Sequence, residues 1–247
     1  MPDDYPDGSA TVVRGVDGCK AGWIAVTITA AGPIEPQVTV SPRFADLIDG
    51  AGIIAVDMPI GLPERAGAGG RGPERHVRPY LGERQSSVFS LPSRSAVHML
   101  DYWEACKVAL ETSDPPRKVS KQAFFLFPKI REIDQMMRAD PTLGRRIFEV
   151  HPELAFWRLN GETAVALPKK VKSLVHGSGL ALRRAILVNH GFPEPFLDKA
   201  PRGAGADDLL DACVNALIAR RLHAGTARPF PDPPLSDAFG LTVAIWA

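Results

Sequence analysis

Three groups of carboxylates stand where secondary-structure elements are predicted to end or begin. Asp17 closes one apolar run and Asp57 closes another. Asp207, Asp208 and Asp211 open a long segment with one apolar face. Carboxylates held close together repel and raise one another's pKa. Hard divalent cations relieve that repulsion, and two of them about 4 Å apart can hold the oxygens of a phosphoryl transfer. The acids therefore predict chemistry on phosphate at bound Mg²⁺ or Mn²⁺, with Asp17, Asp57 and Asp211 as the metal ligands.

The two single acids depend on strands that lie far apart in the chain. β-Branched and apolar residues predict strands over 11–16, 23–29 and 37–40, with the spacing of an antiparallel meander. Residues 44–51 have helical apolar spacing, and the short apolar run 53–57 is typical of a strand buried on both faces. If the first and fourth strands are neighbours, their terminal acids project from the same edge of the sheet.

The third group of acids lies on a predicted helix over 207–223. Its apolar residues form one face, and its acids lie in the first turn, where they complement the helix dipole. Asp211 is three residues from Asp208 and four from Asp207, so either pair shares a face. Packing this helix on the sheet edge brings Asp207 or Asp211 close to the two strand acids.

The rest of the chain is predicted to hold a long insertion and several supporting elements. Residues 64–94 carry six Arg against three Glu and little apolar periodicity, which is typical of a functional or disordered loop. The remaining patterns predict helices over 95–111, 119–138, 153–159 and 179–190, strands over 146–150 and 239–246, and a stiff proline-rich linker over 228–234. Glu149, near the end of the strand over 146–150, is a further catalytic candidate.

Basic and polar residues that could hold a phosphate backbone are spread over several of these elements. Arg is suited to bidentate contacts with phosphate and Lys to a point contact. The candidates for substrate binding are Lys20, Arg84, Ser86, Ser87, Arg94, Lys121, Gln122, Lys129 and Lys170, with Lys169 beside the last of them. Gln122 and Lys129 are seven apart in one predicted helix and are expected to share a face.

Several candidates also have an explanation that involves no chemistry. Asp17 could cap a glycine turn, and Asp57, which precedes a Met-Pro pair, could be a turn residue. The acids of the last helix could only cap it, and the Arg-rich loop could be a solvated insertion. His151 could be a metal ligand, a proton shuttle or a structural hydrogen-bonding residue. A nucleophile at Ser86 or Ser87 lacks a histidine at a readable position to activate it.

The order of predicted elements is similar to that of ribonuclease H-like proteins: three meander strands, helix, strand, helix, strand, helix. Six segments, in order, also resemble the domain-of-unknown-function 429 family, which is predicted to be nuclease-like with this fold. They are GVDGCKAGW, VDMPIGLPE, LGERQSSVFSLPSR, SKQAFFLFPKIREID, EVHPELAFWRLNG and DDLLDACVNALIARR. The resemblance covers most of the chain.

This resemblance implies an α/β fold with a ribonuclease H-like mixed five-stranded sheet, in which a three-strand meander is joined to parallel strands and helices flank the sheet. It implies a single domain over 11–247, with a large insertion over about 58–120 after the fourth strand, and we expect a disordered tail over 1–10. Carried over by position, the acids are Asp17, Asp57, and Asp207 or Asp208 with Asp211.

Composition limits the class of protein without identifying a substrate. The net charge of +1 gives no global nucleic-acid signature, so such binding needs a local patch. The three cysteines are far apart and form no CxxC pair, which favours a reducing compartment. No run approaches the ~18 apolar residues that span a bilayer. We therefore expect a cytoplasmic protein that does not enter the membrane.

The first interpretation of function is a divalent-metal-dependent nuclease that hydrolyses phosphodiesters of nucleic acid. Two alternatives stay open. One is a non-catalytic module that binds phosphate, nucleotide or nucleic acid. The other is a hydrolase of a small phosphorylated metabolite, for which a closed pocket under the insertion is expected. The sequence does not distinguish DNA from RNA and does not give the oligomeric state.

Overall fold

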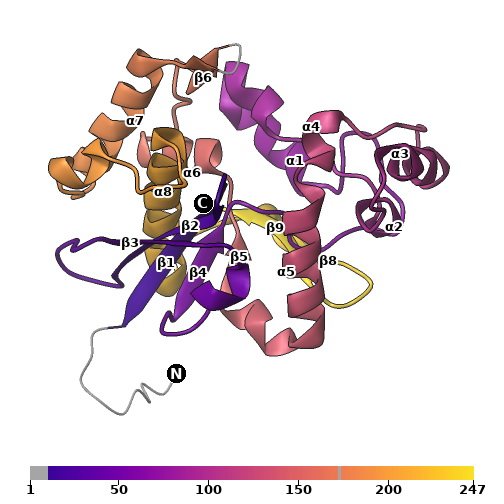
Figure 1. Cartoon of the computed structure of the whole chain (residues 1–247), viewed down its shortest axis with the longest axis horizontal. Helices are drawn as coiled ribbons and strands as arrows, with labels where there is room; N and C mark the ends of the chain where they lie inside the picture. Colours follow the sequence, from indigo (N-terminus) through magenta and orange to yellow (C-terminus); the bar gives the residue numbers. More distant parts are fainter. Residues whose placement is uncertain (1–10, 172–173) are drawn as a thin grey trace.

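The apolar run that contains Asp17 forms the central strand of a five-stranded sheet (Figure 1). The computed structural model describes residues 11–171 and 174–247, so the tail expected over 1–10 lies outside the described residues. The strands are β1 (Val12–Cys19), β2 (Gly22–Thr29), β3 (Gln37–Ser41), β4 (Ile53–Val56) and β5 (Ile147–Glu149). Their order is β3-β2-β1-β4-β5.

The sheet combines an antiparallel meander with parallel strands. β2 runs antiparallel to both β1 and β3, whereas β4 runs parallel to β1 and β5 runs parallel to β4. Val16 is in register with Val56, and Val56 with Glu149. The carboxyl ends of β1, β4 and β5 therefore meet at one edge. The predicted fold class, a mixed five-stranded sheet of ribonuclease H-like order flanked by helices, is confirmed.

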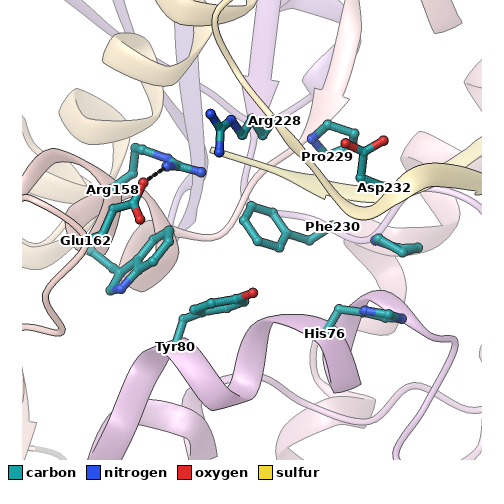
Figure 2. Close-up of a pocket in the computed structure, with 10 residues that line it drawn as sticks. His76, Tyr80, Arg158, Glu162, Arg228, Pro229, Phe230 and Asp232 are labelled. Carbon is teal, nitrogen blue, oxygen red and sulfur yellow. Dashed lines mark hydrogen bonds and ion pairs between the residues drawn. The ribbon is translucent and has the colours of Figure 1, made fainter.

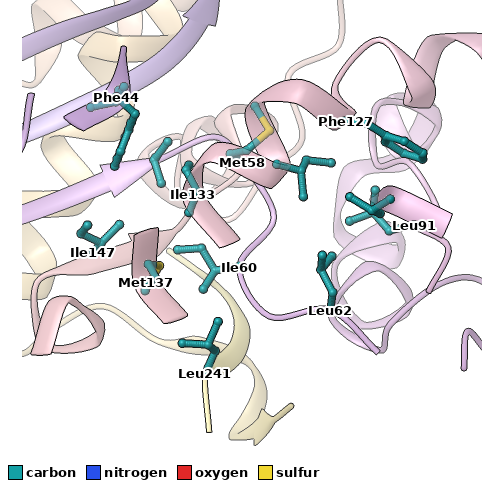
Figure 3. Packing of buried hydrophobic residues seen from close by; sticks show 14 of the residues in the cluster. Phe44, Met58, Ile60, Leu62, Leu91, Phe127, Ile133, Met137, Ile147 and Leu241 are labelled. Atoms are coloured by element: carbon teal, nitrogen blue, oxygen red, sulfur yellow. The ribbon is translucent and has the colours of Figure 1, made fainter. Parts of the chain in front are cut away.

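Alternate residues of the strands face two separate hydrophobic layers. On one side, Val16, Trp23 and Val56 pack with residues of α5 (Phe127–Ala139). Figure 3 shows Phe44, Ile133, Met137 and Ile147 gathered in this layer. The other layer contains Val13, Ile24 and Ala55 with residues of α8 (Ala206–His223). This period of two decides which strand acids can meet α8.

The remaining elements surround the sheet. Between β4 and α5 lie α1 (Pro73–Val77), the 3₁₀ helix η2 (Arg78–Ser87), α2 (Arg94–Val97), α3 (Tyr102–Glu111) and α4 (Lys121–Phe124). After β5 come α6 (Pro152–Leu159), β6 (Lys170–Val171), β7 (Leu174–Val175), α7 (Gly177–Asn189), η4 (Glu194–Asp198) and the hairpin of β8 (Pro229–Ser236) and β9 (Thr242–Trp246). Two more 3₁₀ turns, η1 (Phe44–Leu47) and η3 (Pro141–Arg145), flank the sheet. No helix in the described part of the chain is long and apolar enough to cross a membrane.

Each of the two longest helices that the sequence predicted before residue 140 is divided in two in the structure. The predicted helix over 95–111 is two helices, because Ser93 caps α2 and Asp101 accepts hydrogen bonds from the first amides of α3. The predicted helix over 119–138 is likewise split into α4 and α5. Gln122 and Lys129 therefore lie on different helices, and the prediction that they share a face is wrong. The helix expected over 44–51 is only the 3₁₀ turn η1.

The proline-rich segment over 228–234, predicted to be a linker, is instead part of strand β8. β8 pairs antiparallel with β9, and the register shifts between Phe230 and Leu235. Proline lacks the amide hydrogen that a central strand needs, so it is restricted to edges and irregular positions. The β8–β9 hairpin has only edge strands and an irregular register, so it can accommodate these prolines. Figure 1 shows this hairpin, in yellow, behind α5 and beside β5.

Candidate functional site

Asp17, Asp57 and Asp211 meet where the carboxyl ends of β1 and β4 approach α8. Side chains alternate along a strand, so Asp17 points to the same side as Val13, which packs in the α8 layer. Asp57 directly follows β4, and its amide donates to the Val16 carbonyl at 3.0 Å. Asp211 comes from the second turn of α8 and is buried. Three separate elements thus place one acid each at the same edge, as predicted for these three residues.

Burial raises the pKa of all three carboxyls, and neighbouring acids raise each of them further. The pKa of Asp17 is raised well above its usual value, first by burial and then by Asp211 and Asp57. Burial, reinforced by Asp211, raises the pKa of Asp57 to about 8. Burial raises the pKa of Asp211 to about 6, although the ammonium of Lys169 opposes the shift. The group therefore carries negative charge at an energetic cost that a nearby cation would offset.

Lys169 supplies a positive charge inside this group of acids. Its ammonium forms an ion pair with Asp211 and lies 3.8 Å from a carboxylate oxygen of Glu153. The charges of Asp211 and Glu153, followed by that of Asp17, raise the pKa of Lys169 against the effect of burial. The other carboxylate oxygen of Asp211 is buried without a hydrogen-bond partner. One oxygen of the acid group is thus left unsatisfied even with the lysine present.

The other two acids of α8 have separate roles. Asp208 accepts a hydrogen bond from the Gly205 amide at 2.8 Å and so caps the helix. Asp207 is buried and pairs with Lys170 at 2.5 Å. The structure therefore favours Asp211 as the acid of α8 that joins the strand acids.

The Glu149 side chain points to the α5 side of the sheet, although it lines the same pocket as Asp17 and Asp57. It shares a side with Ile147, which packs in the α5 layer. Its carboxylate is buried, pairs with Arg71 at 2.5 Å, and accepts the Ile60 amide at 2.7 Å. Arg71 in turn pairs with Glu74 at 2.8 Å. In this arrangement Glu149 fixes the start of the insertion to the sheet, so its proposed catalytic role is not the role that its contacts support.

A pocket of about 190 Å³ opens beside the acids at the ends of β1, β4 and β5. Asp17, Asp57 and Glu149 line it from the sheet, Lys129 from α5, and residues of the insertion close it, among them Phe89. Lys129 donates to the Gly22 carbonyl at 2.6 Å, and its ammonium lies 4.8 Å from the centre of a ring of Trp23. Of the predicted substrate-binding residues, Lys129 and Ser87 line this pocket.

His151 and Ser87 form a second polar contact in the same pocket. The Ser87 hydroxyl lies 3.4 Å from Nε2 of His151 and 2.7 Å from the Arg84 carbonyl, to which it donates. Burial lowers the pKa of His151 to about 4, so its ring is neutral at pH 7. Nδ1 of the ring is buried with no hydrogen-bond partner. The sequence did not predict that His151 lies next to Ser87, because 64 residues separate the two.

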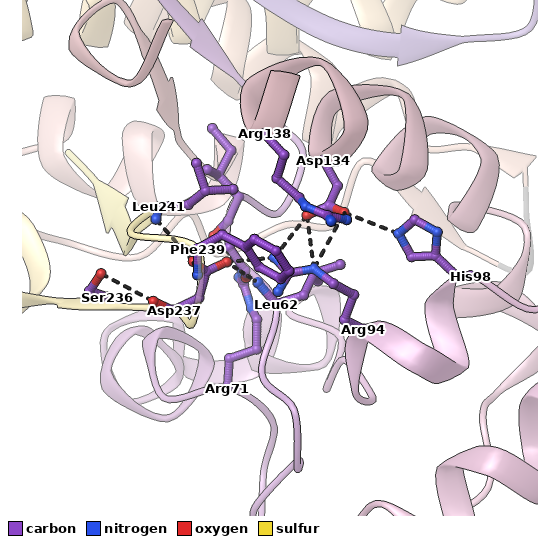
Figure 4. Close-up of polar contacts among 12 residues, drawn as sticks. Leu62, Arg71, Arg94, His98, Asp134, Arg138, Ser236, Asp237, Phe239 and Leu241 are labelled. Atoms are coloured by element: carbon purple, nitrogen blue, oxygen red, sulfur yellow. Dashed lines mark hydrogen bonds and ion pairs between the residues drawn. The ribbon is translucent and has the colours of Figure 1, made fainter. Parts of the chain in front are cut away.

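Arg94, predicted to bind substrate, belongs instead to a buried ion-pair network. It contacts Asp134 at 2.9 Å and Asp237 at 2.5 Å, and His98 contacts the other oxygen of Asp134 at 3.0 Å. Figure 4 shows this network, in which Phe239 lies over the guanidinium at 4.5 Å. The network joins α2, α5 and the β8–β9 connection, so its role is structural.

The other predicted substrate-binding residues lie away from the pocket lining. Lys20 is exposed in the turn between β1 and β2, and Ser86 is exposed at the end of η2. Lys121 and Gln122 are exposed at the start of α4, and Arg84 pairs with Glu83 at 3.2 Å. These five residues therefore do not line the pocket beside the acids, and their part in substrate binding stays a prediction.

Three contacts around the acids had no clear signal in the sequence. Arg183 is fully buried and pairs with Glu153 at 2.6 Å, which fixes α7 to α6. Asn215 of α8 donates to the Val16 carbonyl at 2.9 Å, next to Asp17. The third is the placement of Lys169. Of these three, only Asn215 could have been inferred from the sequence: it is four residues after Asp211 and so lies on the same face of the helix.

A divalent cation fits the donors of this site in chemistry, but not without a change at Lys169. Carboxylate oxygens are the ligands that Mg²⁺ and Mn²⁺ prefer, and Asp211 keeps one oxygen without a partner. Among the described residues, however, no three acidic, histidine or cysteine side chains are already arranged as a metal-ligand set. Asp17, Asp57 and Asp211 could hold such an ion only if their carboxylates moved into a ligand arrangement and Asp211 released the Lys169 ammonium.

The fold and these acids together define an α/β protein of ribonuclease H-like order with carboxylates grouped at the ends of its parallel strands. Comparison with protein families matches residues 15–236 to the family described as protein of unknown function, DUF429. The chain belongs to this family. The comparisons with curated proteins and with solved structures gave no match.

The raised pKa of Asp57 predicts a pH-dependent penalty on folding. The unfolded chain loses this proton near pH 4 and the folded protein near pH 8. Between these values the folded state binds more protons, so the free energy of unfolding falls as pH rises, by up to about 1.4 kcal/mol per pH unit. Replacing Asp57 with Asn removes this contribution. Urea unfolding at pH 5, 6, 7 and 8 is expected to show a shallower decline for the variant.

The matched control is Asp114→Asn, because Asp114 is exposed between α3 and α4. Its unfolding free energy is expected to follow that of the wild-type protein at every pH. Equal slopes for the wild type and Asp57→Asn would contradict the burial and repulsion assigned to Asp57.

Proposed function

We propose that the protein is a divalent-metal-dependent hydrolase of phosphate esters, with nucleic acid as its first candidate substrate. The observation that supports this most is the meeting of Asp17, Asp57 and Asp211 at one sheet edge, with raised pKa values and one unpartnered carboxylate oxygen. Buried carboxylates that repel one another lower the stability of the folded protein, and a bound divalent cation would offset that repulsion.

In this proposal the three carboxylates hold Mg²⁺ or Mn²⁺, which stabilises charge on the phosphate and activates water when bound. Lys169 compensates the charge of Asp211 and would have to release it for an ion to bind there. His151 is neutral at pH 7 and can accept a proton at its unpartnered Nδ1. Lys129 adds a positive charge to the lining of the pocket.

A second candidate, hydrolysis of a small phosphorylated molecule, is favoured by the shape of the pocket. Its volume of about 190 Å³ is small, and residues of the insertion, including Phe89 and Leu91, line it. Most of the basic residues predicted to hold a nucleic-acid backbone lie elsewhere. A single phosphorylated group fits this enclosure more readily than a duplex does.

A metal-dependence assay tests the proposed activity. The protein is stripped with EDTA and offered labelled single-stranded DNA, duplex DNA, RNA and a set of small phosphate monoesters and diesters. Hydrolysis is expected with Mg²⁺ or Mn²⁺ and is expected to be absent with EDTA. Cleavage of the small esters alone would select the second candidate. Binding of nucleic acid with no cleavage under either metal would contradict both hydrolase proposals and leave a non-catalytic module.

The competition between Lys169 and the metal gives this assay a second measurement. Replacing Lys169 with Met removes the resident positive charge, so calorimetry is expected to show Mn²⁺ binding at least tenfold tighter. Lys199→Met is the control, because Lys199 is exposed beyond η4. Unchanged Mn²⁺ affinity in Lys169→Met would show that the ion does not take the place of the ammonium.

We also propose that the protein works in the cytoplasm. Its three cysteines are buried free thiols, which is typical of proteins in a reducing compartment.

A further inference from the structure

A second and larger pocket, of about 300 Å³, lies between η2, α6 and the β8–β9 hairpin. Figure 2 shows Tyr80, Phe230, Arg158 and Arg228 around this opening. None of the carboxylates of the first site lines it. Aromatic rings and arginines line it together with the two acids Glu162 and Asp232, which differs from the buried acid group of the first site.

Three aromatic side chains form one wall of this pocket. The ring centre of Tyr80 lies 4.8 Å from that of Trp157 and 5.4 Å from that of Phe230. Trp157 is buried and holds the group in place, whereas Tyr80 keeps 43% of its surface exposed. An aromatic ring fixed from behind and open in front offers a flat surface for stacking at little entropic cost.

Two arginines, Arg158 and Arg228, lie beside the aromatic wall, and two exposed acids, Glu162 and Asp232, also line the pocket. The Arg158 guanidinium lies 4.9 Å from the Trp157 ring and pairs with Glu162, which is itself exposed. The Arg158 side chain is only 8% exposed, and its Nε is buried without a hydrogen-bond partner. Burial lowers the pKa of Arg158, and the nearby charges of Arg221 and Arg228 lower it further, against Glu162. Arg228 makes no ion pair within the described part of the chain. An anion at this point would pair with Arg228, close to Arg158.

The pocket is separated from the acid site along a single helix. α6 begins at Pro152, next to His151 of the first site, and carries Trp157 and Arg158 in its last turn. Six residues of helix rise about 9 Å. The two sites are therefore neighbours on a shared element but have separate linings, so each can be changed without altering the residues of the other.

We propose that this second pocket binds a nucleotide, with the base against Tyr80 and Phe230 and the phosphate at Arg158 and Arg228. A nucleotide joins a flat aromatic base to an anionic phosphate. The aromatic rings of the pocket can stack on the base, and its arginines can bind the phosphate. The volume is close to the lower end for small-molecule sites and suits one nucleotide unit. The unit is either a free nucleotide or one residue of a single strand. This binding does not depend on hydrolysis at the acid site.

Calorimetry of the whole protein in EDTA tests the proposal with four probes: AMP, adenosine, inorganic phosphate and phosphotyrosine. AMP is expected to bind at least tenfold more tightly than each of the other three. A short single-stranded oligonucleotide is the fifth probe. Tighter binding of the oligonucleotide than of AMP would identify a strand as the natural source of the nucleotide, and the reverse order would identify the free nucleotide. Failure of AMP to bind, or tighter binding of phosphotyrosine, would overturn the proposal.

Matched variants locate the binding within the pocket. Tyr80→Leu and Arg228→Gln are each expected to weaken AMP binding about tenfold, whereas Tyr80→Phe keeps the ring and is expected to keep the affinity. Arg145→Gln is the control, because Arg145 is exposed on η3. Circular dichroism of each variant confirms that it is folded. Asp17→Asn is expected to bind AMP normally, so loss of hydrolysis and loss of this binding are separable results. Unchanged affinity in folded Tyr80→Leu and Arg228→Gln would also overturn the assignment.

Discussion

The Asp17→Asn variant is expected to lose metal-dependent hydrolysis on the order of 10³-fold in kcat while remaining folded. That loss corresponds to about 4 kcal/mol of transition-state stabilisation. Asn is almost the same size as Asp and still accepts the Gly18 amide, which contacts Asp17 at 2.7 Å. It removes the charge that would hold the cation beside Asp57 and Asp211. The measurement is initial rate against Mn²⁺ concentration, with the most active substrate of the metal-dependence assay.

Stability separates loss of chemistry from loss of fold in this experiment. The pKa of Asp17 is raised by burial and by its two acidic neighbours, so its ionised form opposes folding at pH 7. Neutralising it is therefore expected to leave the unfolding temperature unchanged or higher. Asp114→Asn, at an exposed position, is the control for activity. Hydrolysis at the wild-type rate by Asp17→Asn would rule out the proposed metal site.

The strand acids could be predicted because a short-range rule determines their position. Apolar runs of β1 and β4 end at Asp17 and Asp57, and parallel neighbours place their ends at the same edge. The same rule did not predict which side of the sheet Glu149 faces. Whether a residue at the end of β5 faces α5 or α8 depends on the register with β4, which the sequence does not display. Its partner Arg71 comes from an irregular segment with no periodicity to read.

The long-range ion pairs explain most of the remaining differences. Arg94 lies in a predicted phosphate-binding segment, yet its partners Asp134 and Asp237 are 40 and 143 residues away. Lys169 stands beside Lys170 in the sequence as a candidate for phosphate binding, but it reaches the acid group, where Asp211 is its partner. A charged residue has no periodic pattern that marks it as buried. Only the folded arrangement shows which acid compensates it.

The close approach of α8 to β1 places Asp211 at the strand acids, and Gly15 makes that approach possible. A Cβ atom added at Gly15 would lie 2.0 Å from the Ala216 nitrogen and 2.2 Å from the Ala212 carbonyl oxygen. Both are backbone atoms of α8, so no side-chain rotation can relieve the clash. Ala212 and Ala216 are four residues apart and present small side chains on the same helix face. The strand and the helix are thus matched at one crossing point.

The Gly15→Ala variant is therefore expected to lose about 3 kcal/mol or more of unfolding free energy, because α8 must move away from the sheet. The Asn215 side chain, which donates to the Val16 carbonyl at 2.9 Å, would be pulled from its partner by the same movement. Urea unfolding measures the loss. Gly144→Ala is the matched control, since an added Cβ there meets no atom within 4 Å, and its stability is expected to stay within about 0.5 kcal/mol of the wild type. Where Gly15→Ala still folds, displacement of Asp211 is expected to weaken Mn²⁺ binding as well. A variant with wild-type stability and wild-type Mn²⁺ affinity would show that α8 does not depend on this crossing to position its acid.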